Sequence, residues 1–181
     1  HIAMEMLIDH LFEKGHQKIA LATPYSVSGN NPRSTAYVNK MYPILGNKID
    51  NYIFTCTEDT GNFRPEEEDF FHYGEILALQ IIAKKNGITA VVCFNDDLAI
   101  GMIHQLQRSG VRVPQDISVG GIDGLRVGSY LYPKLTTVSI SPFNQGKECA
   151  RILLDMIDGK KVKKRTNLPL KIIEGESVRT L

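Results

Sequence analysis

The stretch ITAVVCFNDDLAIGMIHQLQRSGVRVPQDISVGGID, residues 88–123, decides the fold of this chain. Its run 90–94 is continuously apolar and rich in β-branched residues, which is typical of a buried strand. The polar cluster 95–97 can cap a helix, and the apolar residues after it recur at helical spacing until a glycine ends the pattern. Residues 117–122 then form a second apolar strand that ends at Asp123. The stretch is therefore a predicted strand, helix, strand unit with a polar residue after each strand.

The two polar residues at the strand ends predict a binding site. In open parallel sheets, ligands bind outside the carboxyl ends of the strands, where Asn95 and Asp123 are expected. An amide beside a carboxylate offers donors and acceptors that suit a hydroxyl-rich ligand. The alternative is that Asn95 only caps a helix and Asp123 only starts a turn.

Two further residues are candidates for the same site. Arg33 lies near the start of a predicted helix, where the helix dipole disfavours a cation. Either its guanidinium contacts a ligand at the carboxyl ends of the strands, or it is a surface residue. Phe63 stands alone among polar residues, and it either stacks on a ligand or anchors its loop.

Composition places the chain among ordinary globular proteins. Its 181 residues are 43% hydrophobic and 23% charged, and the net charge of +1 provides no general field for nucleic acid. No apolar run approaches membrane-spanning length, and the first residues do not resemble a signal peptide. His10 and His16 lack a third ligand at a suitable spacing, and Cys56, Cys93 and Cys149 are predicted to be reduced structural thiols, so no metal site is predicted.

The order of elements predicts the fold class. Helices alternate with strands over residues 2–123, which predicts a doubly wound parallel α/β sheet with helices on both faces. A further strand over 135–140, a helix over 143–157 and a closing strand over 169–174 follow. The basic run 160–165 between the last two is interpreted as a solvated loop, with a phosphate or nucleic-acid contact as the alternative.

Six short motifs follow one another along nearly the whole chain. They are HL-x-x-x-GH-x-KIA at 10–20, R-x-x-A-Y at 33–37, FNDDLAIG at 94–101, G-VRVPQDISVGGID at 110–123, P-x-LTTV at 133–138 and ES at 176–177. In this order they resemble the LacI/GalR family of bacterial transcriptional repressors, whose effector domain has the type I periplasmic-binding-protein fold. The sequence is therefore expected to have the C-terminal subdomain of that fold.

The resemblance assigns roles to four residues. It implies that Arg33, Asn95 and Asp123 contact a small, sugar-like effector and that Phe63 stacks on it, with no catalytic residue, metal or cofactor. The sequence departs from the family in three places: the loop 64–73 is long, Gly124 stands where a second aspartate is common, and Ile140 stands where some members place a polar contact.

The resemblance also divides the chain. Residues 1–139 are expected to form the C-terminal effector subdomain, 140–168 a crossover helix segment that packs on a missing N-terminal subdomain, and 169–181 a strand that returns to the first part. Without that subdomain, the apolar face of the crossover helix is expected to pack against a second copy of the chain or to be mobile.

The implied function is effector sensing for a cytoplasmic, homodimeric repressor. A bound sugar-like effector would shift the operator affinity of the full-length dimer, which would contact operator DNA through the missing N-terminal domain and would not contact a membrane. A periplasmic-type sugar-binding protein is the alternative, because it shares the fold. A sugar-processing enzyme is less favoured, because the sequence contains no GxGxxG, P-loop, GxSxG or HExxH motif.

Overall fold

The structure is a computed structural model that describes residues 1–27, 31–56, 69–84 and 86–181. Within these residues, six strands form one sheet in the order β2-β1-β3-β4-β5-β6. The strands are β1 (Ile19–Thr23), β2 (Ile53–Thr55), β3 (Ala90–Cys93), β4 (Ser118–Asp123), β5 (Thr136–Ser139) and β6 (Lys171–Ile173). The helices are α1 (Ile2–Glu13), α2 (Pro32–Leu45), α3 (Phe70–Lys84), α4 (Asp96–Arg108) and α5 (Pro142–Ile157), with 3-10 helices η1 (Gly46–Tyr52) and η3 (Arg126–Tyr130).

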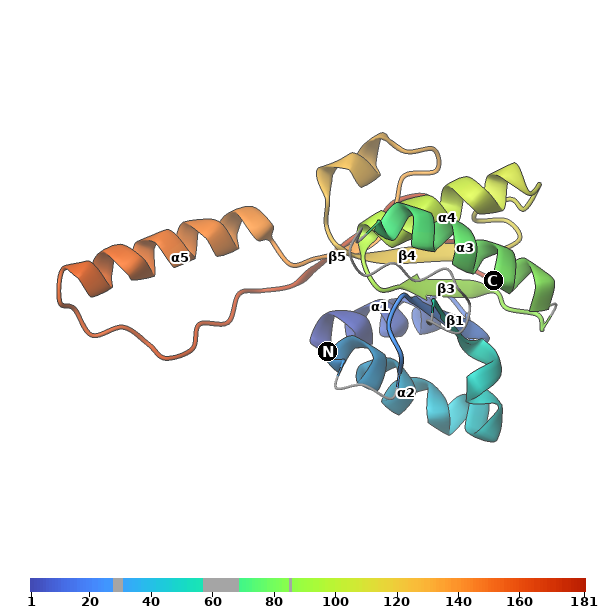
Figure 1. Cartoon of the computed structure of the whole chain (residues 1–181), viewed down its shortest axis with the longest axis horizontal. Helices are drawn as coiled ribbons and strands as arrows, with labels where there is room; N and C mark the ends of the chain where they lie inside the picture. Colours follow the sequence, from blue (N-terminus) through green and yellow to red (C-terminus); the bar gives the residue numbers. More distant parts are fainter. Residues whose placement is uncertain (28–30, 57–68, 85) are drawn as a thin grey trace.

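Helices cover both faces of the sheet, as the sequence predicts (Figure 1). Ile19 and Leu21 of β1 pack into the cluster formed with α1 and α2, whereas Ala20 and Ala22 pack into the cluster formed with α3 and α4. This alternation follows from the two-residue period of a strand. Strands β1 to β4 are parallel, as the alternation over residues 2–123 predicts, and β5 is parallel to β4. Strand β6, whose direction the sequence pattern leaves open, pairs antiparallel with β5.

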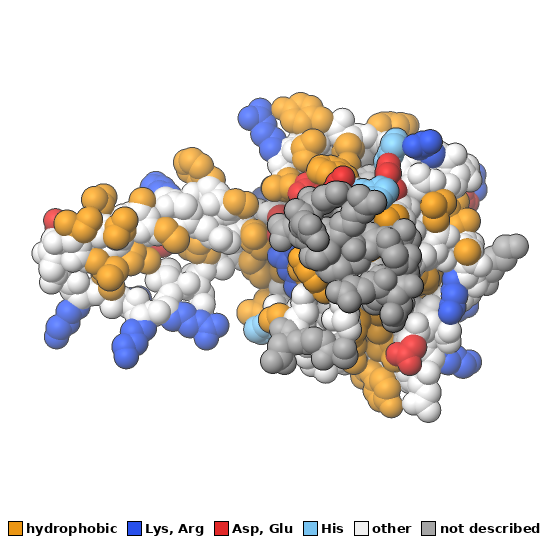
Figure 2. All heavy atoms as spheres, viewed as in Figure 1, with side chains coloured by type: hydrophobic (Ala, Val, Ile, Leu, Met, Phe, Trp, Pro, Cys, Tyr) orange, Lys and Arg blue, Asp and Glu red, His pale blue; other side chains and the backbone are white. Residues whose placement is uncertain are grey.

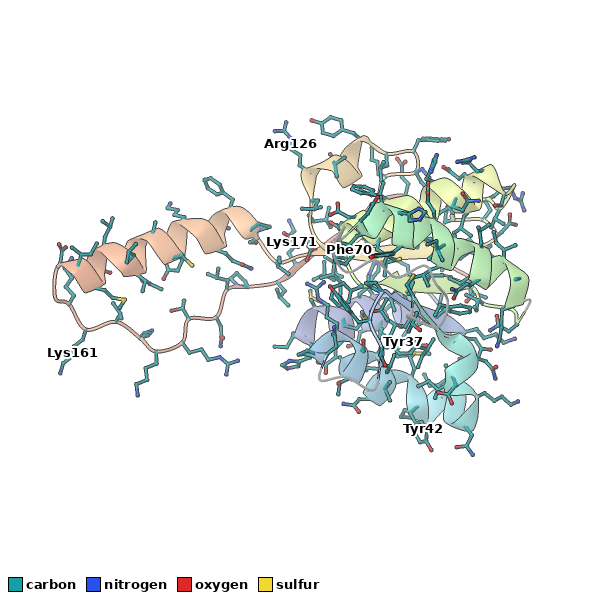
Figure 3. The ribbon with its side chains drawn as sticks, in the orientation of Figure 1. Tyr37, Tyr42, Phe70, Arg126, Lys161 and Lys171 are labelled. Atoms are coloured by element: carbon teal, nitrogen blue, oxygen red, sulfur yellow. The ribbon has the colours of Figure 1, made fainter. Side chains whose placement is uncertain are left out.

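A tyrosine fixes α2 against the sheet. The hydroxyl of Tyr37 is buried and donates a hydrogen bond of 2.8 Å to the carbonyl of Ile19. Figure 3 shows Tyr37 on the side of α2 that faces the sheet, whereas Tyr42, on the same helix, points outward. The helix thus presents one face to the core, as its amphipathic pattern predicts.

Helices α3 and α4 cross at two glycines. A Cβ atom on Gly101 would overlap the carbonyl oxygen of Phe71, and one on Gly74 would overlap that of Leu98. Glycine lowers the stability of a helix interior, and at position 101 it permits this close approach of α4 to α3.

The C-terminal tail is tied to the sheet through a buried serine. The Ser177 hydroxyl donates to the carbonyl of Val119 at 2.6 Å and accepts from the Thr136 amide at 2.8 Å. Nearby, buried His16 binds the Thr89 hydroxyl through Nδ1 and the Arg179 carbonyl through Nε2, both at 3.0 Å. Burial lowers the pKa of His16, because the charged imidazolium loses its hydration there.

Helix α5 stands apart from the sheet, and none of its residues is buried (Figure 1). Figure 2 shows hydrophobic side chains along this helix and Lys and Arg side chains along the segment below it. The exposed apolar residues are Phe143, Leu153, Leu154, Met156 and Ile157. Cys56, Cys93 and Cys149 are free thiols; Cys56 and Cys93 are buried, whereas Cys149 lies on α5 and is exposed. Among the described residues, no helix is long and apolar enough to span a membrane.

The glycine crossing predicts the outcome of a small substitution. Gly101→Ala places a methyl group against the backbone of α3, so we expect the free energy of unfolding to fall by about 2 to 3 kcal/mol. Gly146→Ala is the matched control, because a Cβ there has open space, and it should leave stability unchanged or raise it by up to about 1 kcal/mol. Urea unfolding measures both, and equal effects would contradict the close crossing.

Burial of His16 predicts a pH dependence of stability. Its folded pKa lies below the ordinary 6.5, so its contribution to stability is present above that pH and is lost as the pH falls towards the folded pKa. Unfolding free energies at about pH 7.5 and about pH 5.5 should therefore differ less in His16→Gln than in the parent chain, by at most about 1.4 kcal/mol per pH unit. The exposed His104→Gln serves as control. A parent-like pH dependence in His16→Gln would contradict this assignment.

Candidate ligand-binding site

Asn95 links strand β3 to helix α4 at the carboxyl edge of the sheet. Its Oδ1 accepts a hydrogen bond of 2.9 Å from the Leu98 amide, so the residue caps α4. Asn95 is buried, and its Nδ2 has no hydrogen-bond partner among the described residues. Asn95 therefore caps the helix through its side-chain oxygen, as one of the two sequence interpretations holds. Its side-chain NH2 group can still donate hydrogen bonds to another group.

Arg33 reaches this edge from the first turn of α2. Asn31 caps that helix by accepting from the Arg33 amide at 2.9 Å, which sets the direction in which the side chain leaves. The guanidinium donates to Asp123 Oδ1 at 3.0 Å and to the carbonyl of Phe94. Its central carbon also lies 4.8 Å from the centre of the Phe94 ring. Arg33 and Asp123, two of the predicted site residues, are therefore direct partners.

Asp123 ends β4 in a backbone conformation that is unusual for a residue with a side chain. Its φ is +138°, and Gly124 follows with φ +73°. A Cβ atom on Gly124 would lie 2.5 Å from the Cβ of Ser139, so a second aspartate cannot occupy this position without a rearrangement. Burial raises the pKa of Asp123, and the Arg33 guanidinium opposes this rise.

Asp96 and Asp97 have different surroundings, although they are adjacent in sequence. Asp96 is fully buried and accepts from the Thr137 hydroxyl at 2.6 Å and from the Leu125 amide at 2.7 Å. Burial raises its pKa, and these two hydrogen bonds oppose the rise. Asp97 is half-buried, and its charge adds to the rise in the pKa of Asp123. The sequence marks both residues only as part of the polar cluster 95–97 that can cap a helix, so their place at the site was not predicted.

Three aromatic side chains gather beside the ion pair. The rings of Tyr25 and Phe94 meet edge to face with centres 5.0 Å apart, and Phe70 and Phe94 are stacked at 6.2 Å. Figure 3 shows Phe70 at the start of α3, close to the strand ends. Phe94 ends the apolar run 90–94 that predicts a strand, and no sequence signal marked Phe94 or Tyr25 as a site residue. Phe63 lies outside the described residues, so its predicted stacking stays a prediction.

The side chains at this edge are suited to binding a ligand. Carboxylate, amide and guanidinium groups converge on one edge, and such groups hold hydroxyl-bearing ligands through oriented hydrogen bonds. Among the described residues, no group of three or more His, Cys, Asp or Glu side chains is placed to hold a metal ion.

Residues 8–178 match the periplasmic binding protein-like domain family. The HTH-type transcriptional repressor PurR of Vibrio atlanticus is 34% identical over 174 residues, which cover 95% of this chain and 49% of that protein. The chain thus spans about half the length of this curated relative.

Solved structures of transcription regulators share the fold of this chain. A LacI family transcriptional regulator from Enterococcus faecium, solved with bound ribose, is 25% identical, with a TM-score of 0.77 over 99% of this chain and 63% of that one. The transcription regulator CcpA of Lactococcus lactis, at 22% identity, shares the fold with a TM-score of 0.77 over 98% of this chain and 61% of that one.

The ion pair predicts a measurable coupling. Arg33 and Asp123 are only 24% and 23% exposed, so a double-mutant cycle with Arg33→Met and Asp123→Asn should give a coupling energy of about 1 to 2 kcal/mol. Lys40 and Asp9, at 34% and 50% exposed, form the control pair, for which Lys40→Met and Asp9→Asn should give less than about 0.5 kcal/mol. Chemical unfolding measures all the variants. A coupling no larger than that of the control pair would show that the two groups do not interact in solution.

Proposed function

The chain belongs to the periplasmic binding protein-like domain family, in the form found in LacI/GalR transcriptional regulators, and on this premise we propose that it senses a small effector for such a regulator. The resemblance stated from the sequence is confirmed. Because the chain spans about half of the Vibrio atlanticus relative, the activity of a whole regulator is part of the proposal.

One observation carries the proposal. Arg33, Asn95 and Asp123 come from three separate parts of the chain, and the fold gathers them at the carboxyl edge of the parallel strands. Arg33 contacts Asp123 directly, and Asn95 directly follows Phe94, whose carbonyl and ring Arg33 also contacts. This is the edge at which open α/β sheets bind ligands.

The proposed ligand is a small, sugar-like molecule. The second oxygen of Asp123 and the Nδ2 of Asn95 supply an acceptor and donors, which match the two functions of a hydroxyl group. Asp97 adds a second carboxylate near Asp123, while Arg33 already has a carboxylate partner. This balance favours a neutral ligand over an anionic one. The Enterococcus faecium structure with ribose is consistent with the same ligand class.

The proposed mechanism is a population shift in a larger protein. We assign residues 1–139 and 169–181 to one effector subdomain and 140–168 to a segment that packs on a second subdomain. A ligand between the two subdomains changes DNA affinity if it binds their closed and open arrangements with different strength. In this proposal the regulator is a cytoplasmic homodimer, and DNA binding belongs to another part of it.

A periplasmic-type sugar-binding protein remains the second candidate on the fold alone. The regulator is favoured because the matched relatives are named as transcriptional repressors and the neighbouring structures as transcription regulators. These names are those of regulators and not of enzymes, which supports a binding function.

A thermal-shift experiment tests the proposed site. The chain is screened with D-ribose, other monosaccharides, disaccharides and purine bases, because a ligand that binds the native state raises the melting temperature by mass action. We expect at least one neutral, hydroxyl-rich probe to give a concentration-dependent rise, and Asp123→Asn to abolish it. The phosphate ester of that probe should bind more weakly, because the site already carries excess carboxylate.

The control separates the site from general effects of charge. Asp9→Asn removes an exposed carboxylate from α1 and should keep the full thermal response. A probe that stabilises the Asp123→Asn variant as strongly as the parent chain binds elsewhere, and that result would contradict the proposed site.

A further inference from the structure

We propose that Asp96 is a positioning residue for this site: its buried carboxylate fastens the turn after β4 to the start of α4, so that Asp123 stays beside Arg33. Asp96 itself belongs to neither the predicted set of ligand contacts nor the exposed surface. The inference deepens the proposed function, on which it rests for its biological consequence, but its geometry rests on hydrogen bonds between residues that the structure describes.

The carboxylate joins three elements. Asp96 is the first residue of α4; its Oδ1 accepts from the Thr137 hydroxyl on β5 at 2.6 Å, and its Oδ2 accepts from the Leu125 amide, just past β4, at 2.7 Å. The Thr137 hydroxyl accepts in turn from the Gly124 amide at 3.3 Å. The two residues that follow Asp123 are therefore both held, one directly by Asp96 and one through Thr137.

These hydrogen bonds to the turn after β4 matter because the backbone at Asp123 is strained. A residue with a side chain adopts φ +138° only where its surroundings determine the conformation. Pairing of Asp123 with Ser139 and a bond of 3.3 Å from the Ile140 amide to the Asp123 carbonyl hold it from the β5 side. Asp96 supplies the restraint from α4, the helix that Asn95 caps. One buried group thus sets the positions of Asn95 and Asp123 relative to each other.

The surroundings of Asp96 are built for a charged group. A Cβ atom on Gly121 would overlap Asp96 Oδ1, so the glycine leaves the space that this carboxylate occupies. The N-terminus of α4 favours a negative charge. A fully buried carboxylate is costly unless it is hydrogen-bonded, and here both oxygens are. Burial raises the pKa of Asp96, and the hydrogen bonds from Thr137 and Leu125 oppose this rise by favouring the carboxylate.

Two adjacent threonines on β5 provide a matched test. Thr136 and Thr137 are both buried, but the Thr136 hydroxyl accepts from the Gly175 amide of the C-terminal tail, whereas the Thr137 hydroxyl donates to Asp96. Thr137→Val removes the link to Asp96 and keeps the shape of the side chain. Thr136→Val makes the same chemical change away from the site.

The readout is the Arg33–Asp123 coupling, measured by the double-mutant cycle in each background. We expect the coupling energy to fall by at least about half in Thr137→Val and to stay at its parent value in Thr136→Val. Amide hydrogen exchange at Leu125 should become at least about fivefold faster in Thr137→Val only. Thr137→Ser, which keeps the hydroxyl, should restore both values.

The proposal would be overturned if the Arg33–Asp123 coupling energy kept its parent value in Thr137→Val. It would also be overturned if the coupling energy fell as much in Thr136→Val as in Thr137→Val. Asp96→Asn preserves the size of the side chain and replaces one acceptor with a donor, and it gives the same comparison should Thr137→Val fail to fold. No ligand is needed in these measurements. The positioning role can therefore fail while the proposed effector binding stands, and the reverse also holds.

Discussion

The parallel direction of β1 to β5 is the constraint on which the site depends. Parallel neighbours need a crossover on one face or the other, so each strand ends at the same edge and each connection leaves from there. This brings Arg33, Asn95 and Asp123 together although they lie far apart in the sequence. Short strands are sufficient, because α1 and α2 on one face and α3 and α4 on the other bury both sides of the sheet.

Charge compensation at this edge comes from a few specific partners. Asp123 has Arg33, and Asp96 has Thr137 and the Leu125 amide, whereas Asp97 has no charged partner among the described residues. Partly buried carboxylates at this edge lower the stability of the fold compared with apolar side chains at the same positions. A binding site accounts for such an arrangement better than a structural role does, because ligand hydroxyl groups can supply the missing donors.

Much of the architecture follows from local patterns. The helix and strand around residues 90–108 are predicted nearly to the residue, because the apolar run, the cap at Asn95 and the glycine stop agree with one another. The role of Asp96 could not be predicted in this way. Adjacent residues at a helix start differ in direction, and only the packing of β4 and β5 decides which one is buried. The contact of Tyr25 with Phe94 likewise depends on how two connections meet in space.

The direction of β6 and the exposure of α5 share one cause. Alternation of helices and strands predicts another parallel strand only when the helix between them packs on the sheet. Helix α5 does not, and its short contacts are exposed i,i+3 and i,i+4 pairs such as Arg151 with Glu148 and Asp155, which stabilise a helix only slightly. Sixteen residues form a marginal helix in water without tertiary packing. The apolar side of α5 therefore lacks the packing that usually stabilises such a helix. This is the physical reason for proposing that 140–168 is a segment separate from the rest of the chain.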